Sequence, residues 1–232
     1  MSDSALPLAL ADGRELAVAL RRSPRARRLI LRIDQTGTVT LVLPAIVRLA
    51  EAKAFLAAHQ GWVEARMAKI PGRLPLADGA IVPYLGRDHR IRHRPEARGT
   101  VWLEENELHV AGKPEYLERR VADWLKAQAK RELGDEARRR AAALGRPLGR
   151  ITVRDTRSRW GSCSSKGDLS LCWRLILAPD FVRGYVVAHE VAHLAEMNHG
   201  PRFWRLVDQQ GVDRKAAQRW LRVNGPRLHR YG

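Results

Sequence analysis

Three histidines and one glutamate near the carboxyl end of the chain have a spacing that suits metal chemistry. His189 and His193 are four residues apart in an apolar segment, and Glu190 directly follows the first of them. Residues four apart on a helix share one face, so the two imidazoles can bind the same metal ion. The spacing therefore predicts two metal ligands on one helix, with a carboxylate beside them.

A catalytic zinc site needs a third protein ligand and keeps one position open for water. The helix is predicted to run from Asp180 to about Met197 and to break at Asn198-His199-Gly200-Pro201, because Asn and Gly tolerate left-handed dihedrals and proline starts helices. That turn can bring His199 back to the metal. We predict a zinc-dependent hydrolase with His189, His193 and His199 as ligands and Glu190 as general base.

Other interpretations of the same residues stay open at this point. Glu196 follows His193 by about 4.5 Å along a helix axis, which favours a supporting role over direct ligation. The histidines could be hydrogen-bonded core residues, or the zinc could be structural with Cys163 or Cys172 as a fourth ligand. The two cysteines could also form a cross-strand disulfide, but we expect free thiols in a chain with so few cysteines.

The elements that must position these residues indicate an α+β protein. Alternating β-branched residues predict a hairpin over 29–43, and apolar residues at helical spacing predict one helix from Leu49 to about Ile70. Strands follow near 80–85 and 101–110. We therefore expect a β-rich amino-terminal subdomain with one covering helix over residues 1–112.

The remaining segment, residues 113–232, is predicted to hold the chemistry. It begins with a long amphipathic helix from Glu115 to Leu144, continues with a strand at 151–153, and forms a second hairpin from 160–165 and 169–177. The helix that carries the histidines comes next. Short helices from Pro201 and Asp213 complete the chain.

The composition is that of a folded protein with a strongly basic surface. Hydrophobic residues make up 45% of the chain and charged residues 29%, while Lys and Arg total 42 against 25 Asp and Glu, a net charge of +17. Such a charge favours polyanionic partners such as nucleic acid, or it is spread over solvated helix faces. No apolar run approaches the roughly 18 residues of a membrane span, and no secretory signal is evident, so we expect a cytoplasmic protein.

Several motifs together resemble a known family. They are Trp160-Gly161-Ser162-Cys163, the run from Trp173 to Pro179, the histidine helix, and the segment from Asn198 to Trp204. Over nearly the whole chain they resemble the YgjP-like metallopeptidases, relatives of the SprT-like group. Metzincins share the histidine spacing but have glycine at the position of Glu196, so the chain is not assigned to them.

The resemblance implies a zincin-like fold with zinc on the three histidines, Glu190 as catalytic base, and the strand from Trp160 to Ser164 close to the site. In such folds an edge strand beside the zinc helix pairs with an extended peptide, and residues 157–164 are the candidate here. Arg159 and Tyr185 are candidates to stabilise an oxyanion. The predicted substrate-binding residues are therefore Arg159, Trp160, Gly161 and Tyr185.

The function expected from these features is hydrolysis of peptide bonds in a peptide or protein substrate. Two alternatives are kept. Part of the YgjP-like family is linked to hydrolysis of nucleotide pyrophosphates, although no Gly-rich phosphate loop is present. The SprT-like resemblance and the charge of +17 also fit a protease directed to nucleic-acid-bound proteins.

Overall fold

The computed structural model describes residues 5–34, 37–68 and 72–232, and it has a mixed α+β architecture. The chain divides between Arg73 and Leu74 into two compact units, which are described separately. Within the described residues, no helix combines the length and the apolar composition needed to cross a membrane.

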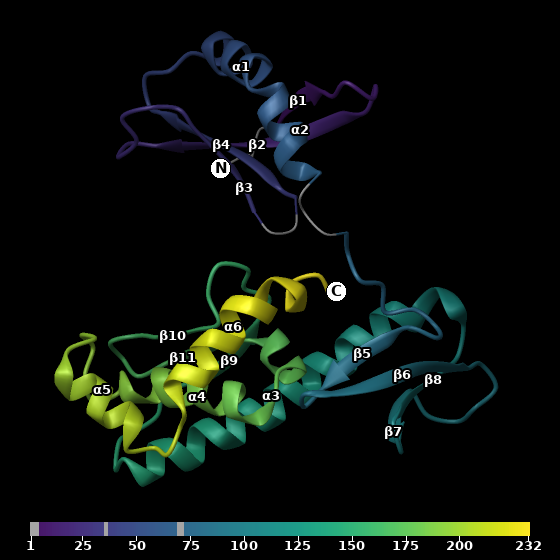
Figure 1. The fold of residues 1–232 in the computed structure, drawn as a ribbon, viewed down its shortest axis with the longest axis vertical. Helices are drawn as coiled ribbons and strands as arrows, with labels where there is room; N and C mark the ends of the chain where they lie inside the picture. Colours follow the sequence, from purple (N-terminus) through teal and green to yellow (C-terminus); the bar gives the residue numbers. More distant parts are fainter. Residues whose placement is uncertain (1–4, 35–36, 69–71) are drawn as a thin grey trace. The chain divides into compact units, whose positions relative to one another are not determined.

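The first unit is built on a four-stranded sheet in the order β1-β2-β4-β3 (Figure 1). The predicted hairpin is confirmed, because β3 and β4 pair antiparallel with Ile30 opposite Val42 and Ile33 opposite Val39. β1 and β2 pair antiparallel, whereas β2 and β4 pair parallel. The strand bounds are Ala5–Ala9 for β1, Glu15–Ser23 for β2, Ile30–Ile33 for β3 and Val39–Pro44 for β4.

Two helices follow this sheet where the sequence predicted one. α1 spans Leu49–Ala58 and α2 spans Gln60–Met67. The break is at His59, which has φ −110° and donates a hydrogen bond from Nδ1 to the Phe55 carbonyl over 2.8 Å. The predicted end of the helix at Ile70 lies outside the described residues. The unit has its own core, made by Leu6, Leu8, Leu10, Val18, Leu20, Val39, Leu41, Leu43, Ala52, Leu56 and Val63.

The second unit begins with another four-stranded sheet, in the order β5-β6-β8-β7. Its strand order repeats that of the first unit, again with one parallel pair, β6 with β8, in the middle. The strands are Ile81–Tyr84 for β5, Arg87–Arg94 for β6, Val101–Glu104 for β7 and Glu107–Ala111 for β8.

This sheet explains why the observed division differs from the expected boundary at residue 112. Its buried residues Val82, Ile91 and Val110 share one hydrophobic core with Val121 and Leu125 of the next helix. A sheet that shares its core with a helix cannot form a separate folding unit from it. The strands at 81–111 therefore belong with the carboxyl-terminal part of the chain.

The long predicted helix is confirmed as α3, Leu117–Ala143, which follows a 3-10 turn at Pro114–Tyr116. Along it, apolar residues at helical spacing form one buried stripe, while its charged residues lie outside this stripe. The stripe consists of Leu117, Val121, Leu125, Ala129, Leu133, Gly134, Ala137 and Ala141.

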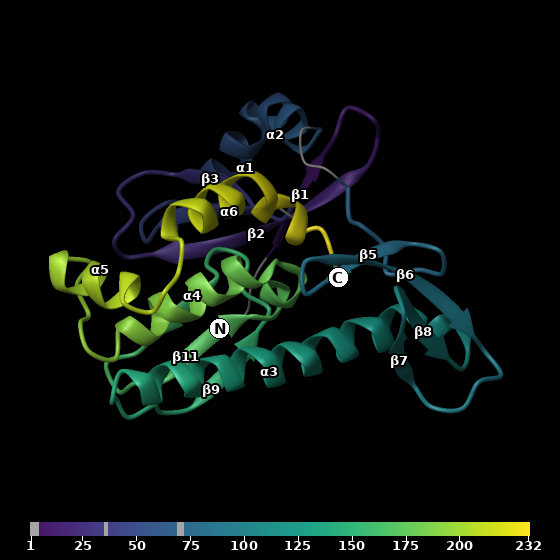
Figure 2. The same ribbon diagram turned by 60° about the horizontal axis from the view of Figure 1, so that its bottom comes forward.

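A three-stranded sheet, a 3-10 helix and three α-helices complete the second unit (Figure 2). The sheet has the order β10-β11-β9, so β10 and β9 are its two edges. β10 pairs antiparallel with β11, which confirms the second hairpin, and β11 pairs parallel with β9. The second arm, predicted to run to residue 177, ends at Cys172, and Trp173–Leu177 form a 3-10 helix. The bounds are Ile151–Arg154 for β9, Gly161–Cys163 for β10, Leu169–Cys172 for β11, Asp180–Ala192 for α4, Pro201–Asp208 for α5 and Arg214–Leu228 for α6.

Candidate metal centre

Helix α4 supplies the first two predicted ligands. It starts at Asp180 directly after Pro179, as predicted, but it ends at Ala192 and not near Met197. His193 is the C-cap residue and keeps helical dihedrals, with φ −66° and ψ −16°. The four-residue spacing therefore still directs His189 and His193 to the same side, although the predicted last turn of the helix is absent.

The early end of α4 changes the role of Glu196. The predicted helical position of this residue does not exist, because the chain has left the helix. Its backbone carbonyl lies 3.1 Å from Nδ1 of His193 and accepts a hydrogen bond from it. A proton held on Nδ1 leaves Nε2 of His193 as the nitrogen with a free lone pair.

The third histidine joins the other two. The ligand atoms of His189, His193 and His199 all lie within 4.8 Å of one another, and Nε2 of His189 is 3.1 Å from Nε2 of His199. Tetrahedral zinc with zinc–nitrogen distances of about 2.0–2.1 Å has nitrogen–nitrogen edges of about 3.3 Å. The three imidazoles therefore fit a divalent metal ion of this kind.

No further ligand completes the group within the described part of the chain, where it contains only these three histidines. Both cysteines are free thiols, as expected. Cys172 is buried and its Sγ lies 3.2 Å from the Thr156 carbonyl, while Sγ of Cys163 lies 3.4 Å from the Ser164 carbonyl. The described cluster therefore offers three ligand atoms, the number that a catalytic zinc site takes from the protein.

Electrostatics favour the neutral form of the ligands. Burial, together with the neighbouring His193 and His199, lowers the pKa of His189 to about 4. Burial also lowers the pKa of His193. Neutral imidazole is the form that binds metal ions, so the cluster is ready for ligation near pH 7.

Glu190 lies beside this cluster in a buried position, with 6% of its surface exposed. Burial raises the pKa of its carboxyl group to about 7, an effect that the positive charge of Arg159 opposes. A carboxyl group with such a pKa can both accept and donate a proton at neutral pH.

Gly161 of β10 makes the space that Glu190 occupies. A Cβ atom on Gly161 would lie 2.5 Å from Cγ, 2.6 Å from Oε1 and 2.8 Å from Cδ of Glu190. Among the residues predicted to bind substrate, Gly161 is thus in direct contact with the carboxylate, and Arg159 acts on it electrostatically from an exposed position.

The other two predicted substrate-binding residues have different surroundings. The Trp160 ring stacks on His229 with centroids 4.6 Å apart, and it packs against Gly225 of α6. Tyr185 is buried with its ring 6.0 Å from that of His189, and its hydroxyl accepts a hydrogen bond of 2.8 Å from Nε2 of Gln218. Both side chains therefore have packing partners of their own in the second unit.

An aromatic pair from α5 surrounds the histidines and was named in the sequence only within the family motif. Phe203 is fully buried, and its ring centroid lies 4.5–4.9 Å from those of the three histidines. Trp204 lies 5.8 Å from both His189 and His199, and the guanidinium of Arg214 lies over its ring at 4.4 Å. These contacts fix the imidazole orientations by packing.

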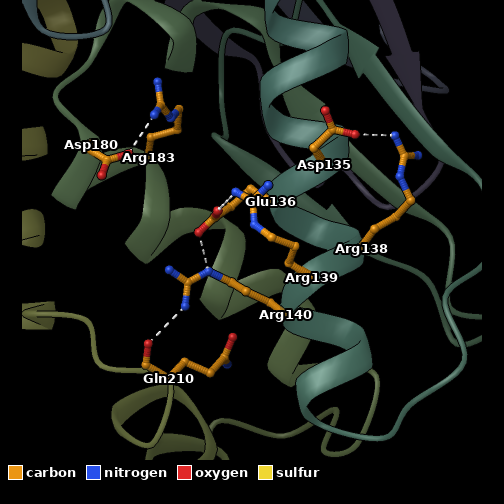
Figure 3. Close-up of polar contacts among 8 residues, drawn as sticks. All are labelled: Asp135, Glu136, Arg138, Arg139, Arg140, Asp180, Arg183 and Gln210. Carbon is orange, nitrogen blue, oxygen red and sulfur yellow. Dashed lines mark hydrogen bonds and ion pairs between the residues drawn. The ribbon is translucent and has the colours of Figure 1, made fainter.

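Polar contacts behind the cluster hold α4 in place, and nothing in the sequence indicated them. Nε2 of Gln210 donates to the carbonyls of Ala188, over 3.0 Å, and Leu206, over 3.1 Å. Arg140 of α3 donates from Nη1 to the Gln210 carbonyl over 3.0 Å and pairs with Glu136 over 2.6 Å (Figure 3). The carbonyl of the residue before His189 is thus hydrogen-bonded to Gln210, which is itself hydrogen-bonded to α5 and to α3.

Comparisons with known proteins identify the family of the chain. No curated protein sequence matches the chain. Among solved structures, the crystal structure of the metallopeptidase zymogen of Pyrococcus abyssi abylysin matches with a TM-score of 0.35 and 22% identity, covering 40% of this chain and 92% of that one. A family model described as YgjP-like, metallopeptidase domain, matches residues 27–224, a span that includes the histidine cluster, Glu190 and Gly161. The chain therefore belongs to the YgjP-like metallopeptidase family.

Proposed function

We propose that the protein is a zinc-dependent peptidase with a zincin-like catalytic centre, in which His189, His193 and His199 hold the metal and Glu190 is the general base. The observation that carries this proposal is the convergence of three imidazoles beside a buried carboxyl group whose pKa is about 7. When bound, zinc would lower the pKa of water to about 7 and polarise the scissile carbonyl.

The residues of the chain account for the proton transfers of peptide hydrolysis. Glu190 accepts a proton from the attacking water and later delivers it to the leaving amine. Burial keeps the carboxyl group near the pKa required for both steps. Arg159, which interacts electrostatically with Glu190, is the proposed source of positive charge for the oxyanion.

The edge strand β10 is the proposed platform for the peptide substrate. The Trp160 carbonyl accepts a hydrogen bond from the amide of Cys172 in β11, and the Ser164 amide donates to the carbonyl of Asp168, directly before β11. Because paired residues alternate in an antiparallel ladder, the backbone groups of Gly161 and Cys163 point to the free edge. An extended peptide paired there would lie beside Glu190, which Gly161 contacts.

Metal analysis and turnover test the proposal together. Purified wild-type protein should contain one zinc ion per chain, and His199→Ala should lose most of it. Glu190→Gln should retain zinc but lose cleavage of an unfolded protein such as casein. Full cleavage by Glu190→Gln, or zinc-free wild-type protein with activity, would contradict the mechanism.

The net charge of +17 favours a second candidate, a peptidase that acts on proteins bound to nucleic acid. Binding of DNA through Lys and Arg should weaken steeply as salt increases. A shallow salt dependence or no binding at low salt removes this candidate. Incubation with nucleoside triphosphates tests the nucleotide-hydrolase alternative in the same preparation.

A further inference from the structure

The edge of the three-stranded sheet opposite β10 carries a second surface that the proposed reaction does not use. There, β9 lies alongside α3 (Figure 2). Residues of both elements line a cavity of about 430 Å³. All residues that line it belong to the second unit.

The rim of this cavity is positively charged without compensation. Lys126 and Lys130 of α3 and Arg154 of β9 line it, and all three are exposed. None of them forms an ion pair with a residue in the described ranges of the chain. The one carboxylate in the lining, Asp155, is paired with the fully buried guanidinium of Arg174. Like charges that converge without a partner favour an anionic ligand.

The floor of the cavity is apolar. The half-buried side chains of Ile151 and Val153 and the buried ring of Trp173 contribute to it. A ligand for this cavity therefore needs apolar groups as well as negative charge, because polar groups that lose water against such a floor gain no hydrogen bond in return.

The free edge of β9 offers both hydrogen-bond donors and acceptors. Among the residues that the structure describes, β9 pairs with β11 alone, and the Leu169 amide donates to the Arg150 carbonyl over 2.9 Å. In a parallel ladder the N–H and C=O of one residue point to the same side and alternate along the strand. Arg150, Thr152 and Arg154 therefore face β11, and the backbone groups of Ile151 and Val153 face outward.

We propose that the groove between β9 and α3 binds an extended, acidic segment of a protein as an added strand, and so serves as a substrate exosite. This proposal rests on the proposed peptidase function. Lys126 and Lys130 are four residues apart, about 6 Å along the helix, close to the roughly 6.6 Å between alternate side chains of a strand. Carboxylates at alternate positions of the bound segment therefore meet the two ammonium groups.

A peptide fits this groove better than a phosphodiester chain does. Peptide N–H groups can donate to the outward carbonyls of Ile151 and Val153, whereas phosphates only accept hydrogen bonds. Apolar side chains at the intervening positions would cover the floor. The groove thus selects for alternating acidic and apolar residues.

Binding to the full-length Glu190→Gln protein tests the exosite without cleavage. A short fluorescent peptide with alternating Glu and Val should bind, measured by anisotropy, and its affinity should fall with salt. The Gln version and a version N-methylated at alternate residues should each bind about tenfold more weakly, because the first lacks charge and the second lacks backbone donors.

Charge reversal on the protein locates the site. Lys126→Glu with Lys130→Glu should weaken peptide binding by at least about tenfold. The matched control, Lys113→Glu with Lys215→Glu, changes the net charge equally at exposed positions outside the cavity and should change binding by less than about twofold. Both double variants should keep the wild-type unfolding temperature.

Three results would overturn the proposal: equal effects of the two double variants, equal binding of the N-methylated peptide, or displacement of the peptide by single-stranded DNA of the same charge at equal concentration. Its failure is separable from that of the peptidase function. Turnover with no acidic-peptide binding removes the exosite alone, whereas binding with no turnover in the wild type removes the proposed function.

Discussion

Replacing Gly161 with alanine should slow catalysis while leaving the metal in place. Gly161 lies in β10 with a backbone outside the left-handed region, so alanine is compatible with its dihedrals. The new Cβ, however, would lie 2.5–2.8 Å from three side-chain atoms of Glu190. Carbon atoms in contact are normally 3.5–4.0 Å apart, so the glutamate or the strand must move.

The size of this movement sets the expected loss of rate. Relieving a 2.5 Å contact requires a displacement of about 1 Å, and a misplacement of that size costs on the order of 100-fold in rate. This corresponds to about 2.7 kcal/mol in activation free energy. The methyl group faces Glu190 and not the imidazoles, so zinc content should stay at the wild-type level.

The assay compares kcat and zinc content of Gly161→Ala with those of Gly134→Ala. Gly134 is a buried glycine of α3, and a Cβ there would meet only the end of the exposed Arg138 side chain, at 3.3 Å. That side chain can move away, so the control should retain wild-type kcat.

A double variant tests whether the loss passes through Glu190. If it does, Gly161→Ala combined with Glu190→Gln should be no slower than Glu190→Gln alone. Wild-type kcat in Gly161→Ala, or full additivity in the double variant, would refute the argument that the contact controls the position of the base.

Three further predictions follow from the centre and its supports. Chelation of the metal should lower the unfolding temperature of the wild type by about 10 °C, because a ligand at 1,000 times its Kd stabilises the folded state by about 4 kcal/mol. The same treatment should leave the unfolding temperature of His199→Ala unchanged. Burial, with the nearby charges of Glu190 and Asp168, raises the pKa of Cys163 to about 11. Iodoacetamide should therefore alkylate Cys163 about 100-fold more slowly at pH 8 than it alkylates a free cysteine. Mass spectrometry of the metal-loaded protein measures the alkylation rate, and a rate equal to that of free cysteine would contradict the prediction. Gln210→Glu should lower the free energy of unfolding more than Gln210→Ala does, because a carboxylate would face the Ala188 and Leu206 carbonyls. Urea titration measures both free energies, and the opposite order of the two variants would reject the role of Gln210 as donor to these carbonyls.

Local patterns in the sequence determined the elements and the chemical groups. The 3.6-residue period of apolar residues predicted α3, and alternating β-branched residues predicted the β3–β4 hairpin. The spacing of His189, Glu190 and His193 indicated the metal chemistry for the same reason, because neighbours on one helix face are fixed by the backbone alone.

Tertiary structure decided the properties that depend on segments distant in the chain. α4 ends at Ala192 and α1 at Ala58, although the apolar patterns continue beyond both. The boundary between the units lies at Arg73 because β5–β8 share a core with α3, which no local pattern records.

The same reason applies to the centre itself. The sequence supplied Glu190, but its raised pKa comes from burial, and the space for it comes from Gly161, 29 residues earlier in the chain. Gln210 holds the carbonyl of Ala188 from the end of α5. Burial and such contacts arise only when segments pack against one another. The sequence therefore determined which residue types lie in the centre, whereas the fold determined the burial and the contacts of these residues.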